Sequence, residues 1–224
     1  MPIHVLIDSS IYRQDQRRCK AGFQAIARLA DADLIALHIP YVVLHEVATQ
    51  QEADYEKHLK DITNGLNSIA RMPLNASMDT EIRDIKLRIE GLSNTLRGFA
   101  EVAFTTWAQQ HSAKIHQIGD EHGRAVMNAY FGGKCPFKQT KARDDIPDAF
   151  IFKTILDLIR AGESPIVIVA DKRFIEKLER HEKTITYDSI DAFIASPAGQ
   201  GLLRKESTAR LLISLQTLTF PAFG

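Results

Sequence analysis

The sequence predicts an α/β protein of three layers, in which helices cover both faces of a central parallel sheet. Short apolar runs rich in β-branched residues alternate with helical patterns along the chain, and this order is typical of such a fold. The first run is apolar throughout, which indicates a strand buried on both faces of the sheet. With 224 residues and 45% hydrophobic content, the chain is long enough to bury this core as one domain.

The N-terminal segment predicts a βαβ unit. We expect a strand over Ile3–Ile7, a helix over residues 16–30, and a second strand over residues 34–39 that Pro40 ends. A right-handed crossover makes the two strands parallel and lays the helix on one face of the sheet. Asp8 directly follows the first strand, at the end where open parallel sheets keep their ligands.

Two long helical patterns come next. The first is expected over residues 41–72 and carries Glu46 about a turn and a half from its start. The second is expected over residues 79–110, with Gly91 and Gly98 as mild interruptions. Two long helices in succession predict an antiparallel hairpin inserted into the α/β core.

The C-terminal half returns to alternating strands and helices. A helix should begin at Pro147, because proline is favoured at the first helical position and pushes Ile146 away from helical dihedrals. The tail over residues 207–224 is ambiguous between helix and strand, and we expect it to pack on the body or on another subunit. The other expected elements are an extended segment over 114–118, a helix over 120–131, a loop over 132–137, a strand over 166–169 ahead of Asp171, a helix over 174–180, a strand over 184–187 and a helix over 189–195.

Composition excludes some classes of protein and leaves others open. Lys+Arg 28 balances Asp+Glu 28, and only local clustering of charge matters to a phosphate, so net charge argues neither for nor against nucleic acid. Cys19 and Cys135 stand alone without a CxxC pair, which disfavours a disulfide framework or a zinc site. No export signal and no apolar run of about 20 residues is present, so we expect a cytoplasmic protein without a membrane span.

Four acidic residues occupy positions from which their side chains can converge. Asp8 and Asp171 each follow a strand, Asp148 opens the helix before the second of these strands, and Glu46 lies early in a helix. Carboxylates in one pocket repel one another unless a proton or a cation joins them, and hard oxygen ligands select Mg²⁺ or Mn²⁺. Such ions activate water and stabilise a leaving oxygen, which is the chemistry of phosphodiester hydrolysis.

Each acid also has an ordinary explanation. Asp8 after a strand is a typical turn or cap residue, Asp148 complements a helix dipole, and Asp171 can cap the following helix. The presence of all four acids together, two of them directly after strands, favours the metal site over these separate explanations. We interpret Asp144 and Asp145 as loop or capping acids, and all eight histidines as structural or surface residues.

These residues resemble the motifs of PIN-domain nucleases, a family of metal-dependent ribonucleases that includes toxins of toxin–antitoxin pairs and factors of RNA processing and decay. The resemblance covers roughly residues 3–50 and 140–195. Many members have Thr or Ser shortly before the last aspartate, where this chain has Val169-Ala170. The matching segments are Asp8-Ser9-Ser10, Leu44-His45-Glu46-Val47, Asp148-Ala149-Phe150-Ile151 and Asp171-Lys172-Arg173-Phe174.

The resemblance implies a three-layer α/β/α PIN-like fold with a central parallel sheet and a helical-hairpin insertion, in a single domain over residues 1–224. The core would comprise about residues 1–50 and 140–195, the insertion about residues 50–135, and the C-terminal tail about residues 200–224. The insertion exceeds what small members of the family carry.

The resemblance also implies a Mg²⁺/Mn²⁺-dependent endoribonuclease that leaves a 5′-phosphate and a 3′-hydroxyl. Asp8, Asp148 and Asp171 would bind the metal directly or through water. Glu46 would complete the acidic pocket and orient the water, and Ser10 would support Asp8 by a hydrogen bond.

Lys138, Lys141 and Arg143 are candidate phosphate contacts on charge alone, because they flank Asp148 in an expected loop. The expected substrate is RNA, single-stranded or structured, and the family also suggests an antitoxin-like or other protein partner and a homodimer. One alternative to the nuclease function is a catalytically inactive PIN-like scaffold that binds RNA or a protein partner. A second is a receiver-like phosphotransfer domain, which fits worse because the first strand lacks paired acids and Glu46 would have no role.

Overall fold

The computed structural model describes residues 1–179 and 183–218, with residues 212–218 described by their backbone alone. The chain divides into two compact units. The first comprises Met1–Val43 and Ala108–Gly224, and the second comprises Leu44–Trp107. Within the described part of the chain, no helix combines the length and the apolar character that crossing a membrane requires.

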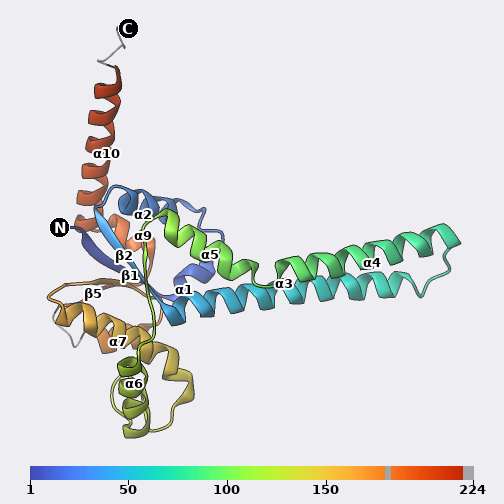
Figure 1. Ribbon diagram of the computed structural model, residues 1–224, viewed down its shortest axis with the longest axis horizontal. Helices are drawn as coiled ribbons and strands as arrows, with labels where there is room; N and C mark the ends of the chain where they lie inside the picture. The colour runs from blue at the N-terminus through green and yellow to red at the C-terminus, as the bar shows by residue number, and fades with distance from the viewer. Residues whose placement is uncertain (180–182, 219–224) are drawn as a thin grey trace. The chain divides into compact units, whose positions relative to one another are not determined.

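The first unit is built on a parallel sheet of five strands in the order β3-β2-β1-β4-β5 (Figure 1). Its central strands are buried because their side chains are apolar on both faces, and Val5, Leu6, Val167 and Ile168 are fully enclosed. The predicted three-layer α/β fold with a central parallel sheet is therefore confirmed. The strands are β1 (Ile3–Ile7), β2 (Ile35–Pro40), β3 (Lys114–His116), β4 (Ile166–Ile168) and β5 (Ile185–Tyr187).

The strand order reverses between β1 and β4. The chain first builds β2 and β3 on one side of β1, then returns to build β4 and β5 on the other side. Ile7 lies beside Ile168 in the parallel register, and the Asp8 amide donates a hydrogen bond to the Ile168 carbonyl at 2.9 Å. Ligands of open parallel sheets bind beyond the carboxyl ends of the strands at such a reversal, so the fold itself marks the place to look for a site.

Helices cover both faces of this sheet. α2 (Ala21–Asp31) and α9 (Ile190–Ala195) lie on one face, and α7 (Ile146–Arg160) lies on the other (Figure 1). α2 directs Phe23, Ile26 and Leu29 into the core. The remaining elements of this unit are α1 (Ser9–Tyr12), the 3₁₀ turn η1 (Arg13–Asp15), α6 (Asp120–Gly132), the 3₁₀ turn η2 (Arg143–Asp145), α8 (Lys172–Leu178) and α10 (Pro197–Leu218).

The second unit is helical. α3 (Tyr41–Ile69) begins directly after β2 and continues into this unit, and α4 (Ala76–Leu96) runs back antiparallel beside it (Figure 1). The Gly98 amide donates a hydrogen bond to Glu52 Oε1 at 2.6 Å, which sets the register of α4 along α3. α5 (Phe99–Gln110) then leads out of the unit. The predicted helical-hairpin insertion is confirmed.

Two predicted helices have different bounds. The helix expected over residues 16–30 begins at Ala21, because Arg18 adopts a left-handed φ of 54° and Lys20 is extended. The helix expected over residues 79–110 is two helices, because Arg97 is extended and Gly98 has a φ of 73°. Glycine adopts this left-handed conformation without steric cost, so the chain turns at Gly98 where the apolar pattern alone continues.

The start of α7 is a further correction. Ile146 is helical, with φ −63° and ψ −47°, although the residue before proline usually avoids this region. The turn η2 leads straight into α7, and the Ile146 amide donates a hydrogen bond to the Arg143 carbonyl, which holds Ile146 in the helical conformation. In the tail, residues 207–218 are helical as part of α10, and residues 219–224 lie outside the described chain.

Candidate functional site

Asp8 stands at the carboxyl end of β1 and caps helix α1. Its Oδ2 accepts hydrogen bonds from the Ser10 amide at 3.0 Å and from the Ser10 hydroxyl, and the side chain is buried. The Ser10 hydroxyl also accepts a hydrogen bond of 3.4 Å from the Ala170 amide. Ser10 therefore joins the end of β1 to the segment that follows β4, and it holds the Asp8 carboxylate in one orientation.

Asp171 stands in the corresponding place after β4. Its Oδ1 accepts a hydrogen bond of 2.8 Å from the Arg173 amide, so the residue caps helix α8, and it is exposed to solvent. The capping roles considered for Asp8 and Asp171 are thus both observed. Capping does not exclude a second role, because an ionised carboxylate has two oxygens and about four lone-pair sites.

Asp148 lies half-buried in the first turn of α7, where the charges of Asp8 and Asp171 act on its carboxyl group. Burial raises the pKa of Asp148 to about 6; Lys177 opposes this rise, while the negative charges of Asp8, Asp171 and Asp145 add to it. Charges act on a pKa in this way only when they lie near one another. The structure therefore brings Asp8, Asp148 and Asp171 within electrostatic reach, at the point where the strand order reverses.

Glu46 lies half-buried in α3, in the second compact unit. The three aspartates belong to the first unit. The role of Glu46 in an acidic site with them stays a prediction.

The donor chemistry of the three aspartates fits a hard divalent cation. Carboxylate oxygens are the ligands that Mg²⁺ and Mn²⁺ prefer, and a cation offsets both the burial of Asp148 and its repulsion by Asp8 and Asp171, which together raise its pKa. Across residues 1–179 and 183–218, however, no three Asp, Glu, His or Cys side chains gather closely enough to hold a metal ion. Metal binding by these residues stays a prediction.

Asp145 has a structural role beside this site. It is buried, and it accepts a hydrogen bond of 3.0 Å from the Lys138 amide, with the Lys138 ammonium 3.3 Å from its other oxygen. Burial acts to raise the pKa of Asp145, but the hydrogen bonds from Lys138 outweigh it and lower the pKa. Asp145 thus braces the loop before α7. Lys141 and Arg143 are exposed in the same loop, whereas Lys138 is already paired.

Lys177 was not predicted from the sequence as part of the site. This lysine lies half-buried in α8 and acts on both Asp148 and Asp145, lowering the pKa of each carboxyl. It follows Asp171 by six residues on the same short helix, and that nearness to an expected ligand was the available signal. Lys177 therefore places a positive charge near the carboxylates of Asp148 and Asp145.

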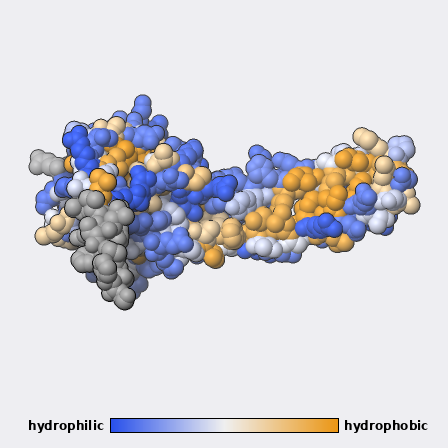
Figure 2. Space-filling view, turned by 90° about the horizontal axis from the view of Figure 1, so that it is seen from above, coloured by the Kyte–Doolittle hydropathy of each residue, from blue (hydrophilic) through white to orange (hydrophobic). Residues whose placement is uncertain are grey.

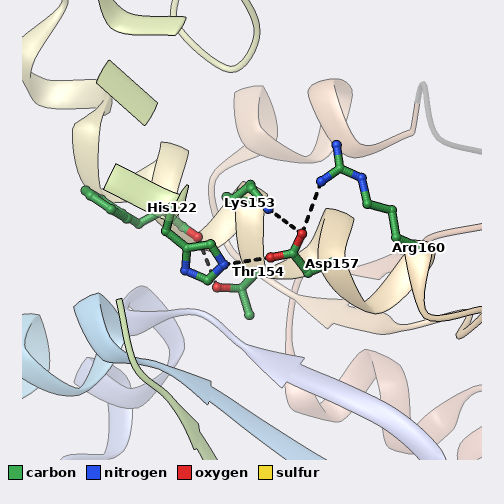
Figure 3. A network of polar contacts seen from close by, with 6 residues as sticks. His122, Lys153, Thr154, Asp157 and Arg160 are labelled. Atoms are coloured by element: carbon green, nitrogen blue, oxygen red, sulfur yellow. Dashed lines mark hydrogen bonds and ion pairs between the residues drawn. The ribbon is translucent and has the colours of Figure 1, made fainter. Parts of the chain in front are cut away.

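A second polar network joins α6 to α7 (Figure 3). Asp157 lies 2.6 Å from His122 Nε2, accepts from the Lys153 ammonium, and lies 3.3 Å from Arg160. These partners hold the pKa of Asp157 below its ordinary value, although burial opposes them. A cavity of about 470 Å³ lies between the same helices, and Arg124, Lys153 and Arg160 are among its lining residues. We interpret this network as packing between α6 and α7, because Asp157 pairs with His122 of α6 and with Lys153 and Arg160 of α7.

Comparison with known protein families gives a match. A family model described as PIN domain matches residues 5–174, a span that contains Asp8, Glu46, Asp148 and Asp171. Searches of curated proteins and of solved structures gave no match.

Proposed function

Since this chain belongs to the PIN-domain family, whose members are generally nucleases, we propose that it is a Mg²⁺- or Mn²⁺-dependent endoribonuclease. The observation that carries the proposal is that Asp148, half-buried beside the strand-order reversal, lies within electrostatic reach of both Asp8 and Asp171. A carboxyl whose pKa is raised by burial and by neighbouring acids at the carboxyl ends of parallel strands is typical of a functional site.

In this proposal Asp8, Asp148 and Asp171 hold the metal, and Glu46 completes the pocket and orients the attacking water. The bound cation would activate that water and stabilise the charge on the leaving oxygen. Ser10 keeps the Asp8 carboxylate oriented through its hydroxyl. Ordered ligands bind a cation at a smaller entropic cost, so Ser10 acts as a positioning residue.

The proposed substrate contacts lie in the loop before α7. Lys141 and Arg143 are exposed there, and with Lys138 they are the proposed contacts to RNA phosphates. The charge of Lys138 is partly neutralised by Asp145, so it contributes least. Cys19 and Cys135 are exposed free thiols, which supports the reducing cytoplasm as the proposed compartment.

Substitution of the aspartates tests the proposal. Asp8→Asn and Asp148→Asn should each reduce cleavage of single-stranded RNA in Mn²⁺ by more than about a hundredfold, since each removes a charged ligand. Asp144→Asn is the matched control, because Asp144 is an exposed acid of the neighbouring turn η2, and its cleavage should equal the wild type. Circular dichroism checks that each variant stays folded. Undiminished cleavage by folded Asp8→Asn or Asp148→Asn protein would contradict the assignment.

Calorimetry with Mn²⁺ separates this function from a catalytically inactive scaffold. The nuclease should bind Mn²⁺, and Asp148→Asn should weaken that binding while Asp144→Asn should not. Absence of Mn²⁺ binding and of cleavage, together with retained association with RNA, would favour the inactive PIN-like scaffold.

A further inference from the structure

The hairpin of α3 and α4 carries the sequence pattern of a coiled coil. Apolar residues recur at alternating spacings of three and four, which is the repeat of helices that pack along a continuous seam. This pattern extends over most of α4, from Met78 to Leu96. The repeating residues are Tyr55, Leu59, Ile62, Leu66 and Ile69 in α3, and Met78, Ile82, Ile85, Ile89, Leu92 and Leu96 in α4.

The hairpin buries only one of the two rows that make up this pattern. An inner row is buried or half-buried between α3 and α4, and it consists of Leu59, Leu66, Ile82, Ile89 and Leu96. An outer row stays in solvent, with exposed fractions from 43% at Ile85 to 51% at Ile62, and it consists of Ile62, Ile69, Met78, Ile85 and Leu92. A coiled-coil pattern normally buries both rows, so the outer row lacks the cover that its sequence predicts.

The outer rows of the two helices lie on the same face of the hairpin. α3 and α4 are antiparallel and turn equivalent rows toward each other, so the next row around each helix points to the same side. Figure 2 shows apolar residues gathered in a strip along the hairpin. This strip is a face of two adjacent helices, and not a set of scattered apolar side chains.

The strip has an internal symmetry. The hydrogen bond between Gly98 and Glu52 sets the match of the two helices, and counting inward from it puts Ile85 opposite Gly65. In α4 the outer row is centred on Ile85, with Met78 and Leu92 seven residues to either side. In α3 the outer row is centred next to Gly65, because Ile62 and Ile69 lie three residues before and four after it.

One twofold axis at this level therefore suits both helices. It would place Met78 of one copy on Leu92 of the other, and Ile62 of one copy on Ile69 of the other. A Cβ added at Gly65 would meet nothing within 4 Å, so the chain leaves open space at the centre of the face, where two backbones can approach closely.

The charges beside the strip obey the same symmetry. Glu81 and Arg88 are exposed and flank Ile85, four residues before it and three after. The axis that stacks Met78 on Leu92 brings Glu81 of one copy to Arg88 of the other, twice in the pair. The face is thus complementary to itself in charge as well as in shape, which selects a second copy over an unrelated partner.

We propose that two copies of this chain pair through the outer row of the hairpin, α4 antiparallel on α4 and α3 antiparallel on α3, to form a four-helix bundle. With 21 residues, α4 is about 31 Å long, and two helices present a face about 20 Å wide. The pair would then bury about 1,200 Å² in total, which exceeds the roughly 1,000 Å² expected of a specific interface. This pairing does not depend on nuclease activity.

Sedimentation velocity of the full chain tests the pairing. The wild type should be a dimer at micromolar concentration, and Ile85→Glu should raise its dissociation constant by more than about tenfold, because a carboxylate at the axis has no partner. Leu87→Glu is the matched control, since Leu87 is 64% exposed on α4 but lies outside the outer row. Leu87→Glu should dimerise like the wild type.

Exchange of the flanking charges tests the register. Glu81→Arg and Arg88→Glu should each weaken the dimer, because each places like charges together twice. The double variant Glu81→Arg/Arg88→Glu should regain wild-type affinity, and an equimolar mixture of the two single variants should form a mixed dimer. Both sites are exposed, so circular dichroism should show unchanged helix content.

Three results would overturn the proposal. They are a wild type that stays monomeric at high micromolar concentration, an Ile85→Glu protein that dimerises as well as Leu87→Glu, and single-charge variants that do not recover when mixed. A monomer that pairs through this face only with another protein counts among these contrary results.

Discussion

The buried charge of Asp148 opposes the stability of the folded protein near neutral pH. Burial raises its pKa to about 6, and the charges of Asp8 and Asp171 add to the rise. In the unfolded chain an aspartate titrates near 3.9, so the folded-state pKa is the higher of the two. The protonated side chain therefore stabilises the folded protein below about pH 4, and this contribution is lost as the pH rises through about 6.

Asp148→Asn should accordingly stabilise the metal-free protein near neutral pH. The neutral amide avoids the cost of the buried charge, and we expect the free energy of unfolding to rise by about 1 kcal/mol, a value reduced to allow for the partial exposure of the side chain. Denaturant unfolding across acid and neutral pH measures the gain, which should vanish below about pH 4. Asp144→Asn serves as the control and should show no such gain. A metal-free Asp148→Asn protein no more stable than the wild type at neutral pH would show that the charge costs nothing.

Three strands of the sheet are joined by a row of histidines. His4 Nδ1 lies 2.9 Å from His38 Nε2, and His38 Nδ1 lies 2.7 Å from His116 Nε2. Neighbouring ring centres are 5.0 Å apart in both pairs. His4 Nε2 also lies 3.0 Å from a carboxylate oxygen of Glu163. Because a carboxylate only accepts, His4 carries its proton on Nε2, and the two ring-to-ring hydrogen bonds then put the protons of His38 and His116 on Nε2 as well.

His38, the middle histidine of this row, resists protonation in the folded protein. Burial, together with the charged forms of His116, His4 and Lys114, lowers the pKa of His38 to about 3. His116 is half-buried, and burial, Lys114 and His122 lower its pKa while Asp157 opposes them. The folded-state pKa of His38 thus lies below the value of about 6.5 in the unfolded chain. Its contribution to stability is present above about pH 6.5 and is lost as the pH falls toward about 3.

His38→Leu should therefore flatten the acid side of the stability curve. Between pH 6.5 and about 5, the wild type should lose about 2 kcal/mol of unfolding free energy relative to this variant, since each pH unit in that window costs about 1.4 kcal/mol. Denaturant unfolding at several pH values gives the difference. His58→Leu is the control, because His58 is exposed in α3, and its curve should parallel the wild type. Parallel curves for His38→Leu would show that His38 takes up its proton freely in the folded state.

The elements differ in how far the sequence predicts them. Strands β1 and β4 and the aspartates after them were predictable, because buried apolar runs and the acids that end them are local features. The start of α2 was not, because it depends on the left-handed φ of Arg18, a conformation that arginine does not favour. The α7 start at Ile146 was missed because the preceding turn overrides the proline rule. The histidine row arises from strand register, which brings residues 34 and 78 positions apart into contact.

The whole molecule has no excess of positive charge with which to attract RNA. Lys+Arg 28 equals Asp+Glu 28, so the proposed affinity for RNA depends on a local cluster of cations, and the proposed cluster is the one near Asp148. Lys141 and Arg143 are exposed there, Lys138 is paired with Asp145, and Lys177 lies within electrostatic reach of Asp148. A protein of this kind should contact few phosphates and respond weakly to salt.

Binding of single-stranded RNA by the Asp8→Asn protein, which should not cleave it, measures this response. If two or three cations contact phosphates, the logarithm of the affinity should fall with the logarithm of the salt concentration at a slope of about −1.5 to −2. Lys141→Ala and Arg143→Ala should each make the slope shallower by about 0.7, since each removes one phosphate contact. Lys138→Ala should change it least, because Asp145 already neutralises that charge, and it should instead destabilise the loop. A slope much steeper than about −2, or an equal effect of Lys138→Ala, would mean that RNA engages a different and larger set of cations.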